Sequence, residues 1–266
     1  MPFPGARARR ETRHNSRLSG VASIRMNAVP RREDRPKPAS DAPSRAASRA
    51  VNITIEIPGV ILGVIEASQT RVAPADAELA SEMDATCERM RRESSMQQVA
   101  ELAPIHAVRA MFRAWGVDPA RYRPSAEALL RRVVQGKGLY RVSNVVDINN
   151  LGSIESGWPY GSYDRAAIAL PVALRLGRVG EKYEGIGKQT WHLEGRPILA
   201  DCHGPFGSPI SDSTRTMITE AARAVFTVIF APASSEAGAV ERAIERHTRR
   251  LERYAGATIQ EAAVLT

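Results

Sequence analysis

The chain changes character near residue 50, and only the part beyond this boundary has the pattern of a folded domain. Residues 1–50 hold twelve Arg or Lys, four Asp or Glu and six Pro, and they show no hydrophobic period. A segment of this composition cannot bury enough apolar surface to offset the entropy lost on ordering. Directly afterwards, isoleucines occupy every second position, which is the period of a half-buried strand. We therefore predict a disordered basic tail over residues 1–50 and a folded domain over residues 51–266.

The net charge of the chain changes at the same boundary. The formal charge is +8, and residues 1–50 account for all of it, because the rest of the chain holds 25 residues of each sign. The net charge of the domain therefore does not indicate a basic nucleic-acid-binding surface. Any RNA contact of the domain must come from local patches, and the tail is expected to add non-specific contact with nucleic acid.

The sequence offers no membrane or export signal. Its longest apolar stretches, 60–65 and 224–230, are far shorter than the roughly 20 residues of a membrane-spanning helix. The start lacks the apolar run of a signal peptide, and its prolines argue against the amphipathic helix of a transit peptide. Cys87 and Cys202 form neither a disulfide framework nor a Cys-x-x-Cys pair, which fits a reducing compartment. We predict a cytoplasmic protein without membrane association.

The spacing of apolar residues predicts both helices and strands. Helical spacing occurs three times between residues 79 and 134, with Gly116 placed to end the second helix and Pro124-Ser125 to supply the entry and N-cap of the third. A buried strand at 224–230 and an amphipathic helix at 238–254 are expected near the end of the chain. This order indicates an α+β or mixed α/β fold rather than a doubly wound sheet.

Polar residues intrude among the apolar ones between residues 136 and about 212, where we expect short strands and Gly/Pro turns. In the stretch NVVDINN, the residues Val145, Val146 and Ile148 are typical of a strand that Asp147 and two asparagines interrupt. Amides at the end of a strand can orient a water molecule or a substrate. Asn and Asp are also ordinary turn residues, and residue type alone favours that second interpretation.

Three other polar stretches are less specific. GWPYGSYD, residues 157–164, is expected to be a loop whose aromatic residues either wall a small-molecule pocket or simply pack. LADCHG, residues 199–204, contains metal-ligand types, but neither a zinc-ribbon nor a helical His spacing, so we predict no metal. His203 is either an acid or base or a surface histidine. SDSTRT, residues 211–216, gathers hydroxyls around Arg215 and could hold a phosphate or form a solvated turn. With no P-loop, no cofactor is predicted.

In order along the chain, YRPSAEALLRR, NVVDINN, GWPYGSYD, GEKYEGIG, ILADCHG and SDSTRTMIT resemble the B3/B4 module of the phenylalanyl-tRNA synthetase beta subunit, especially its free-standing relatives. The resemblance runs from about Ile105 to Phe230. It implies an α+β fold of mixed β-sheets packed with helices. In the synthetases this module houses the editing site, where tyrosine wrongly attached to the phenylalanine tRNA is hydrolysed. The resemblance therefore implies tRNA as partner, through its aminoacylated 3′ end, and ester hydrolysis as reaction.

The resemblance also places individual residues. The family segment V-D-x-T-N matches residues 146–150, so Asn150 falls on the pocket asparagine and Asn149 replaces a threonine. The segment G-x-P-x-H-A-x-D matches residues 157–164, and its pocket histidine falls on Gly161. We expect a pocket opened by this glycine to accept a different or larger group. A pocket glutamate of the bacterial enzymes is missing, and Ser211 or Asp212 is the nearest substitute.

The resulting hypothesis is a trans-acting deacylase of mischarged tRNA, with Asn149, Asn150 and Asp212 as catalytic residues. The expected substrate-binding residues are Asp147, Gly157, Pro159, Gly161, Tyr163, Asp164, Asp201, His203, Ser213 and Arg215. Class II aminoacylation motifs are missing, so the protein is not expected to charge tRNA. The alternative is a module that kept the fold, lost the chemistry and binds RNA or a free amino acid. A metal-dependent hydrolase built on Cys202 and His203 is a distant third.

Overall fold

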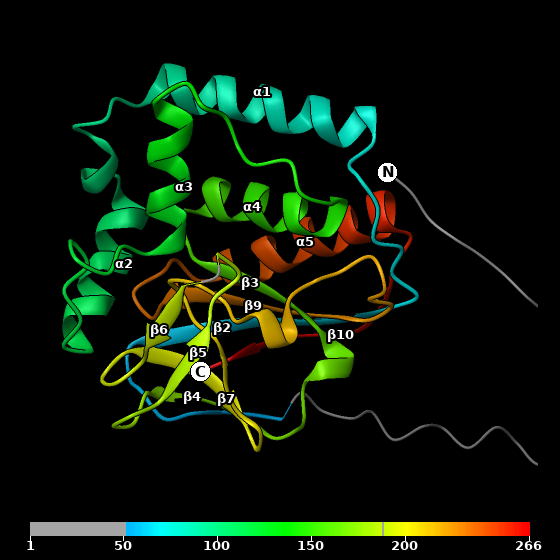
Figure 1. Cartoon of the computed structure of the whole chain (residues 1–266). Helices are drawn as coiled ribbons and strands as arrows, with labels where there is room; N and C mark the ends of the chain where they lie inside the picture. Colours follow the sequence, from blue (N-terminus) through cyan, green and yellow to red (C-terminus); the bar gives the residue numbers. More distant parts are fainter. Residues whose placement is uncertain (1–51, 188) are drawn as a thin grey trace, which may run out of the picture. The chain divides into compact units, whose positions relative to one another are not determined.

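A computed structural model describes residues 52–187 and 189–266 (Figure 1), so the predicted tail over residues 1–50 lies outside the described residues. The described part has five α-helices and ten strands. The helices are α1 (Ala77–Glu93), α2 (Ala103–Ala114), α3 (Ser125–Val134), α4 (Asn144–Ser156) and α5 (Ala239–Ala255). The strands are β1 (Ile53–Ile55), β2 (Val60–Ser68), β3 (Tyr160–Asp164), β4 (Val172–Leu176), β5 (Lys182–Glu184), β6 (Thr190–His192), β7 (Pro197–Asp201), β8 (Gly204–Gly207), β9 (Val225–Pro232) and β10 (Thr258–Leu265).

Two four-stranded sheets and a hairpin organise the strands. The first sheet has the order β10-β2-β9-β3 and is antiparallel throughout. The second has the order β1-β4-β7-β8, in which β1 runs parallel to β4 and the other pairs are antiparallel. Strands β5 and β6 form the hairpin. The fold is therefore α+β with mixed sheets, as predicted.

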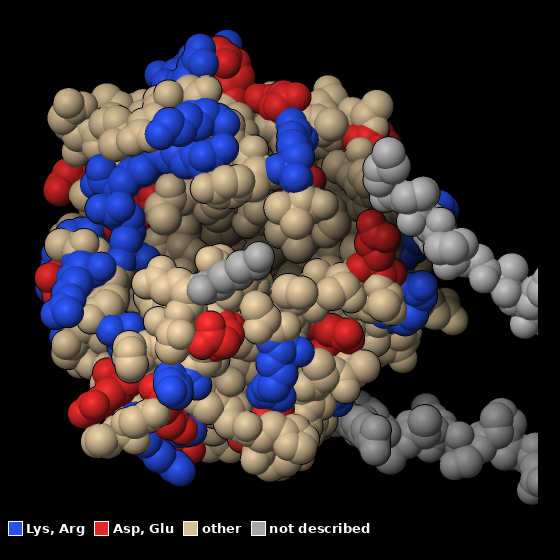
Figure 2. Space-filling model, viewed as in Figure 1, with Lys and Arg blue, Asp and Glu red and all other residues tan. Residues whose placement is uncertain are grey.

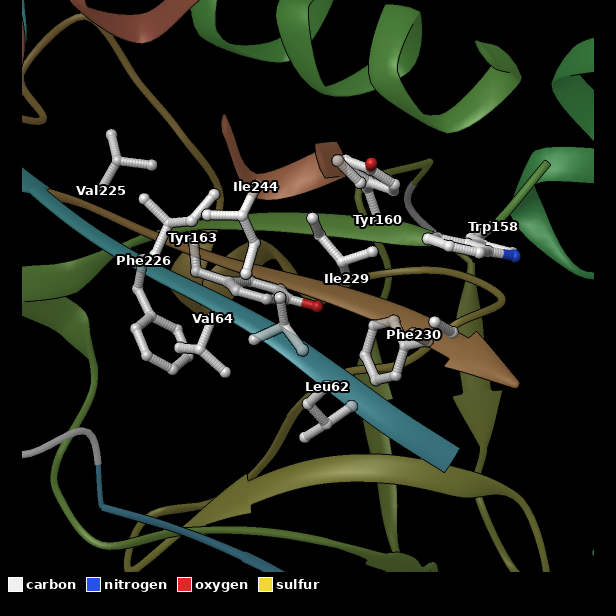
Figure 3. Packing of buried hydrophobic residues seen from close by; sticks show 14 of the residues in the cluster. Leu62, Val64, Trp158, Tyr160, Tyr163, Val225, Phe226, Ile229, Phe230 and Ile244 are labelled. Carbon is white, nitrogen blue, oxygen red and sulfur yellow. The ribbon is translucent and has the colours of Figure 1, made fainter. Parts of the chain in front are cut away.

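The elements lie in layers. Helices α4 and α5 cover one face of the first sheet, with α1 outside them, and the second sheet lies on the opposite side of the first (Figure 1). All eight residues of β9 are buried, because this strand runs through the middle of the stack with apolar side chains on both faces. Figure 3 shows the two directions: Tyr160 points toward the helices, whereas Phe226 and Phe230 point away from them.

Most predicted elements are confirmed, with one local difference at α3. The apolar spacing gives α1, α2 and α5, and Gly116, at φ 76°, follows the end of α2. Helix α3 also forms, but its N-cap is Pro124, which offers no side-chain hydrogen bond. Ser125 is instead the first helical residue, and its buried Oγ has no hydrogen-bond partner among the described residues. The prediction that Pro124-Ser125 supplies a capping side chain is therefore wrong.

The stretch NVVDINN is helical, and the prediction of a strand there is wrong. It forms the first half of α4, where the Ser143 Oγ accepts a hydrogen bond from the Val146 amide at 3.4 Å. Gly157, at φ 73°, ends the helix in the left-handed conformation. Apolar residues continue at helical spacing beyond the stretch, at Leu151 and Ile154, and are buried. Helical periodicity over thirteen residues therefore outweighs the strand preference of the β-branched residues at its start.

The stretch GWPYGSYD is not a loop throughout. Its second half is β3, which pairs in antiparallel register with β9, from Tyr160 opposite Ile229 to Asp164 opposite Val225. Side chains of a strand alternate between its faces. Neighbouring residues of β3 therefore lie on opposite faces of the sheet.

The described residues contain no helix long and apolar enough to cross a membrane. Both cysteines of the chain, Cys87 and Cys202, are free thiols.

Candidate functional site on the two faces of strand β3

Strand β3 brings together three of the predicted polar stretches. Its residues contact Asn149 of α4 on one side and Asp212, in the loop after β8, on the other. Tyr160 points toward the helices (Figure 3). The alternation of side chains along a strand places Ser162 on the same face as Tyr160, and Gly161 and Tyr163 on the face toward the second sheet. The stretches therefore meet at one strand but on its two opposite faces, and they do not share a single set of contacts.

On the helix side, a chain of hydrogen bonds ties α4 to the sheet. The Asn149 Nδ2 donates to the Tyr160 carbonyl at 3.3 Å, and its Oδ1 accepts from the Ser162 Oγ at 2.9 Å. The Ser162 Oγ lies 2.9 Å from the Thr227 Oγ1, which must donate because the serine proton is already used. Both polar ends of the Asn149 amide are thus engaged inside the protein.

The same face is closely packed around Tyr160. Its ring centroid lies 5.6 Å from that of His247 on α5. A Cβ placed on Gly152 of α4 would lie 2.9 Å from the Tyr160 ring, so the helix needs glycine there to approach the strand. Burial, reinforced by the nearby Arg250, lowers the pKa of His247 to about 3. This histidine is therefore neutral at physiological pH, and its ring nitrogens have no hydrogen-bond partner among the described residues.

On the sheet side, Tyr163 is completely buried and holds a carboxyl group. Its hydroxyl donates to the Asp212 Oδ1 at 2.9 Å. The ring packs edge-on against Phe206, with centroids 5.1 Å apart. Burial, together with the nearby Asp212, raises the pKa of Tyr163 well above its usual value, so the phenol stays protonated. The tyrosine is thus fixed both by packing and by its donated hydrogen bond.

The Tyr163 phenol fills the space above two glycines. A Cβ on Gly161 or on Gly207 would overlap the phenol oxygen and the adjoining ring carbon. The prediction that Gly161 opens the pocket is therefore wrong, since the volume freed at this position is occupied by the chain's own tyrosine. Any ligand on this side must bind beside Tyr163 rather than above Gly161.

Asp212 combines a fixed oxygen with a free one. Its Oδ1 accepts hydrogen bonds from the Tyr163 hydroxyl and from the Ser208 amide at 3.3 Å. Its Oδ2 has no hydrogen-bond partner among the described residues, and the residue is only half-buried. Burial raises the pKa of Asp212 to about 7 and outweighs the lowering effect of the two hydrogen bonds. The carboxyl therefore titrates near neutral pH with one oxygen available.

The loop that carries Asp212 is held by internal hydrogen bonds. The Ser208 Oγ and the Tyr183 hydroxyl both donate to the Ser211 carbonyl, each at 2.6 Å. Ser213 is buried, its amide bonds to the Phe206 carbonyl at 3.0 Å, and its Oγ has no partner among the described residues. The loop is thus a fixed support for the Asp212 carboxyl.

Asp201 and Arg215 form a separate ion pair away from Asp212. The guanidinium of Arg215 makes two contacts with the Asp201 carboxylate, at 2.9 and 3.1 Å, and also donates to the carbonyls of Ala167 and Gly204. Burial alone would raise the pKa of Asp201, but Arg215 and two backbone amides lower it. The pair joins the β7–β8 turn to the segments around it, so neither side chain is free as it stands.

The remaining predicted residues lie at several places. Asp147 is buried in the first turn of α4, where its Oδ1 accepts from the Val142 amide at 2.9 Å and burial raises its pKa. Asp164 caps the turn after β3 by accepting from the Ala166 amide, and the Pro159 carbonyl accepts from Phe230 of β9. His203 is exposed. Asn150 is half-buried on α4 without a side-chain hydrogen bond to a described residue. Their roles as ligands stay predictions.

Four residues that form side-chain hydrogen bonds in the site are not identified by the sequence analysis: Ser162, Tyr183, Ser208 and Thr227. Ser162 lies inside GWPYGSYD, and the alternation of side chains along a strand places it on the face opposite to that of Gly161. Tyr183 lies in GEKYEGIG, whereas no motif contains Ser208 or Thr227. The described residues contain no group of three or more His, Cys, Asp or Glu side chains that could hold a metal ion.

Comparison with known proteins identifies the family. A model of the B3/4 domain matches residues 107–264, and the chain belongs to this family. It is 31% identical over 155 residues to the phenylalanine–tRNA ligase beta subunit of Thermobifida fusca, covering 56% of this chain and 18% of that protein. It is also 31% identical over 136 residues to the beta subunit of a Synechococcus species, covering 44% of this chain and 16% of that protein.

A solved structure is also similar. It is an N-terminal fragment of the phenylalanyl-tRNA synthetase beta subunit from Pyrococcus horikoshii, with a TM-score of 0.40 and 15% identity, over 81% of this chain and 55% of that one. The chain spans less than a fifth of the length of the two ligase subunits above. The family membership supports a function related to tRNA synthetases.

Proposed function

We propose that this protein hydrolyses the ester of mischarged aminoacyl-tRNA in trans. The observation that carries the proposal is the Asp212 carboxyl, which has a pKa of about 7, one oxygen fixed and the other free. A general base is most effective when its pKa lies near the working pH, because it is then both available and basic enough. Asp212 also lies in the segment where the related synthetases carry a pocket glutamate.

In the proposed reaction, the free Oδ2 of Asp212 takes a proton from a water molecule. The water oxygen attacks the ester carbonyl, the bond between the carbonyl and the ribose oxygen breaks, and the ribose oxygen receives a proton. The hydrogen bonds from Tyr163 and Ser208 fix the direction of the carboxyl, so little reorganisation is needed. Asn149 and Asn150 both lie on α4, across the first sheet from Asp212, so neither takes part in this step, and the Asn149 amide supports the strand.

The preferred amino acid is smaller than tyrosine in this proposal. Tyr163 already fills the space beside Gly161 and Gly207, so a second aromatic ring does not fit there without displacing it. Alanyl, seryl and glycyl esters are therefore better first substrates than tyrosyl esters. An open space at Gly161 would instead favour esters of larger amino acids.

A deacylation panel tests the proposal. The full chain is incubated with tRNAs charged with alanine, serine, glycine, phenylalanine or tyrosine, and the remaining ester is measured over time. We expect faster loss of at least one small aminoacyl group than in buffer, and a return toward the buffer rate for Asp212→Asn. If every ester decays at the buffer rate with the unaltered protein, the proposed activity is wrong.

A binding module without catalysis is the second candidate. It is favoured by Asn149, which falls on a family pocket position but has both polar ends engaged internally. The overlap of Tyr163 with the space above Gly161 favours it as well. Saturable binding of tRNA or of a free amino acid, together with no turnover in the panel, would support this candidate over the enzyme.

We further propose that the protein acts in the cytoplasm and that its domain begins near residue 51. The two free cysteines fit a reducing compartment. Cell fractionation tests the first statement. Limited proteolysis tests the second, since cleavage confined to the first fifty residues would leave a stable fragment.

A further inference from the structure

A concave surface beside α3 gathers positive side chains around an exposed aromatic ring. Its cavity measures about 460 Å³, and no Asp or Glu lines it. The lining residues are Met96, Arg123, Ala128, Leu129, Arg131, Arg132, Gln135, Lys137 and Tyr140, which we call the α3 basic surface. Figure 2 shows Lys and Arg side chains in a run along this side of the molecule, next to a hollow between the helices and the strands below them.

The positive charge of the α3 basic surface is only partly neutralised. Glu127, whose side chain is 1% exposed, accepts from Arg109 and Arg131 at 2.9 Å each and lies 3.7 Å from Arg123. One buried carboxylate thus faces three guanidinium groups and neutralises only one of their three positive charges. Arg132 and Lys137 have no carboxylate partner among the described residues. A surplus of positive charge therefore faces the cavity, although the domain as a whole is neutral.

The aromatic ring adds a second kind of recognition. The guanidinium carbon of Arg132 lies 3.9 Å from the centroid of the Tyr140 ring, and the tyrosine is 53% exposed. The buried Nε of Arg132 has no hydrogen-bond partner among the described residues. Stacked arginine and tyrosine planes in a positive groove suit an unpaired nucleobase and its phosphate.

The same combination continues next to Arg123. Arg196 lies 3.8 Å from the centroid of the Tyr122 ring and donates to the Tyr122 hydroxyl at 2.6 Å. Arg121 lies 5.1 Å from the same centroid. Positive and aromatic side chains thus extend beyond the cavity itself.

Helix α5 provides a contrasting row of arginines. Arg249 pairs with Glu245 at 2.5 Å, Arg253 pairs with Glu78, and Arg250 lies 2.7 Å from both Glu82 and Glu155. Most of that row is therefore neutralised by carboxylates. The α3 basic surface and α5 are both rich in arginine. They differ because most of the arginines on α5 pair with a carboxylate, whereas Arg132 and Lys137 pair with none among the described residues.

We infer that the α3 basic surface binds an unpaired segment of RNA, with Arg132 and Lys137 contacting phosphates and Tyr140 stacking on a base. This inference rests on the RNA partner of the proposed function and assigns that partner a place on the domain. A phosphate-bearing lipid surface shares the charge but not the need for a concave cavity with a stacked ring, so RNA is the occupant that these contacts favour.

Binding of deacylated tRNA to the full chain tests the inference. This probe has no ester, so its binding is independent of hydrolysis. The double variant Arg132→Ala and Lys137→Ala is compared with Arg242→Ala and Arg249→Ala, which removes the same charge from exposed, paired positions on α5. Affinity is measured at several salt concentrations, and thermal unfolding checks that both variants fold.

We expect the double variant Arg132→Ala and Lys137→Ala, the α3 variant, to bind deacylated tRNA roughly tenfold more weakly than the unaltered protein. The slope of log affinity against log salt should become shallower by about 0.7–0.9 for each lost phosphate contact. The α5 variant should match the unaltered protein, and Tyr140→Phe should bind better than Tyr140→Leu. Equal losses in both double variants, or none in the α3 variant, would overturn the inference. So would binding of anionic phosphatidylserine vesicles in the absence of tRNA binding. A hydrolysis defect in Asp212→Asn with unchanged binding separates this inference from the proposed activity.

Discussion

The two faces of strand β3 use hydrogen bonds for different purposes. On the helix side, an amide and two hydroxyls, from Asn149, Ser162 and Thr227, satisfy one another and join α4 to the sheet. On the sheet side, a buried phenol donates to a carboxyl that keeps one oxygen free and titrates near neutral pH. Neutral groups that are satisfied internally position the strand, whereas the half-buried, titratable carboxyl is the group proposed to act as the base.

The largest expected effect is on the sheet side, for Asp212→Asn. Replacing the carboxyl by an amide removes the proposed base and should slow deacylation by about 10²–10⁴-fold. Single-turnover decay of the preferred aminoacyl-tRNA measures this directly. The matched change on the helix side, Ser162→Ala, removes one hydroxyl of the internal network and should leave most of the rate. If the helix-side variant loses more activity than Asp212→Asn, the division between the two faces is wrong.

The next effect concerns packing at Gly161. A methyl group there overlaps the buried Tyr163, so Gly161→Ala should lower the free energy of unfolding by about 1–3 kcal/mol through overpacking. Chemical denaturation measures the loss. Gly187→Ala is the control, because a Cβ at Gly187 meets nothing within 4 Å. An unchanged unfolding midpoint for Gly161→Ala would show that Tyr163 does not occupy this space.

A smaller effect is expected from the helix-side network. Thr227→Val keeps the shape but removes the hydroxyl that donates to Ser162, and should cost about 1 kcal/mol of unfolding free energy. Deacylation should be nearly unaffected. Denaturation and rate measurements on the same sample separate the two outcomes, and a rate loss without a stability loss would assign chemistry to the helix side.

The smallest effect is a shift in pH dependence. The hydrogen bond from Tyr163 lowers the pKa of Asp212, so Tyr163→Phe should raise that pKa above about 7. Since the proposed base acts when deprotonated, the rate rises with pH through this pKa, and the midpoint should move to higher pH by less than about one unit. Rate–pH profiles measure the shift, with Tyr160→Phe on the opposite face as the unchanged control. A midpoint that moves to lower pH would contradict the assignment.

The sequence predicted the layers of the fold better than its polar segments. Alternating isoleucines, a continuous apolar run and long apolar periods identify β1, β9, α1 and α5, because each pattern extends over several turns or strand residues. The stretch NVVDINN misleads because its β-branched residues dominate a short window. The cap at Ser143 and the buried residues after it determine that it is helical.

The candidate site was only partly predictable for a related reason. Asn149, Gly161 and Asp212 were named from their types and from the family resemblance. Their partners were not, because the contact between Ser162 and Thr227 depends on the register of two strands that are 65 residues apart. Arg215 illustrates the same limit: its type indicates an anion site, but only the fold shows that Asp201 already serves as the anion.

The overlap between positions 161 and 163 has a consequence for evolution. A large side chain at position 161 and a tyrosine at position 163 compete for the same volume next to Gly207. A histidine at 161 therefore fits only when the ring at 163 is absent. We expect the two positions to change together among relatives, so that lineages with an open cleft and lineages with a filled one are separated by a double substitution.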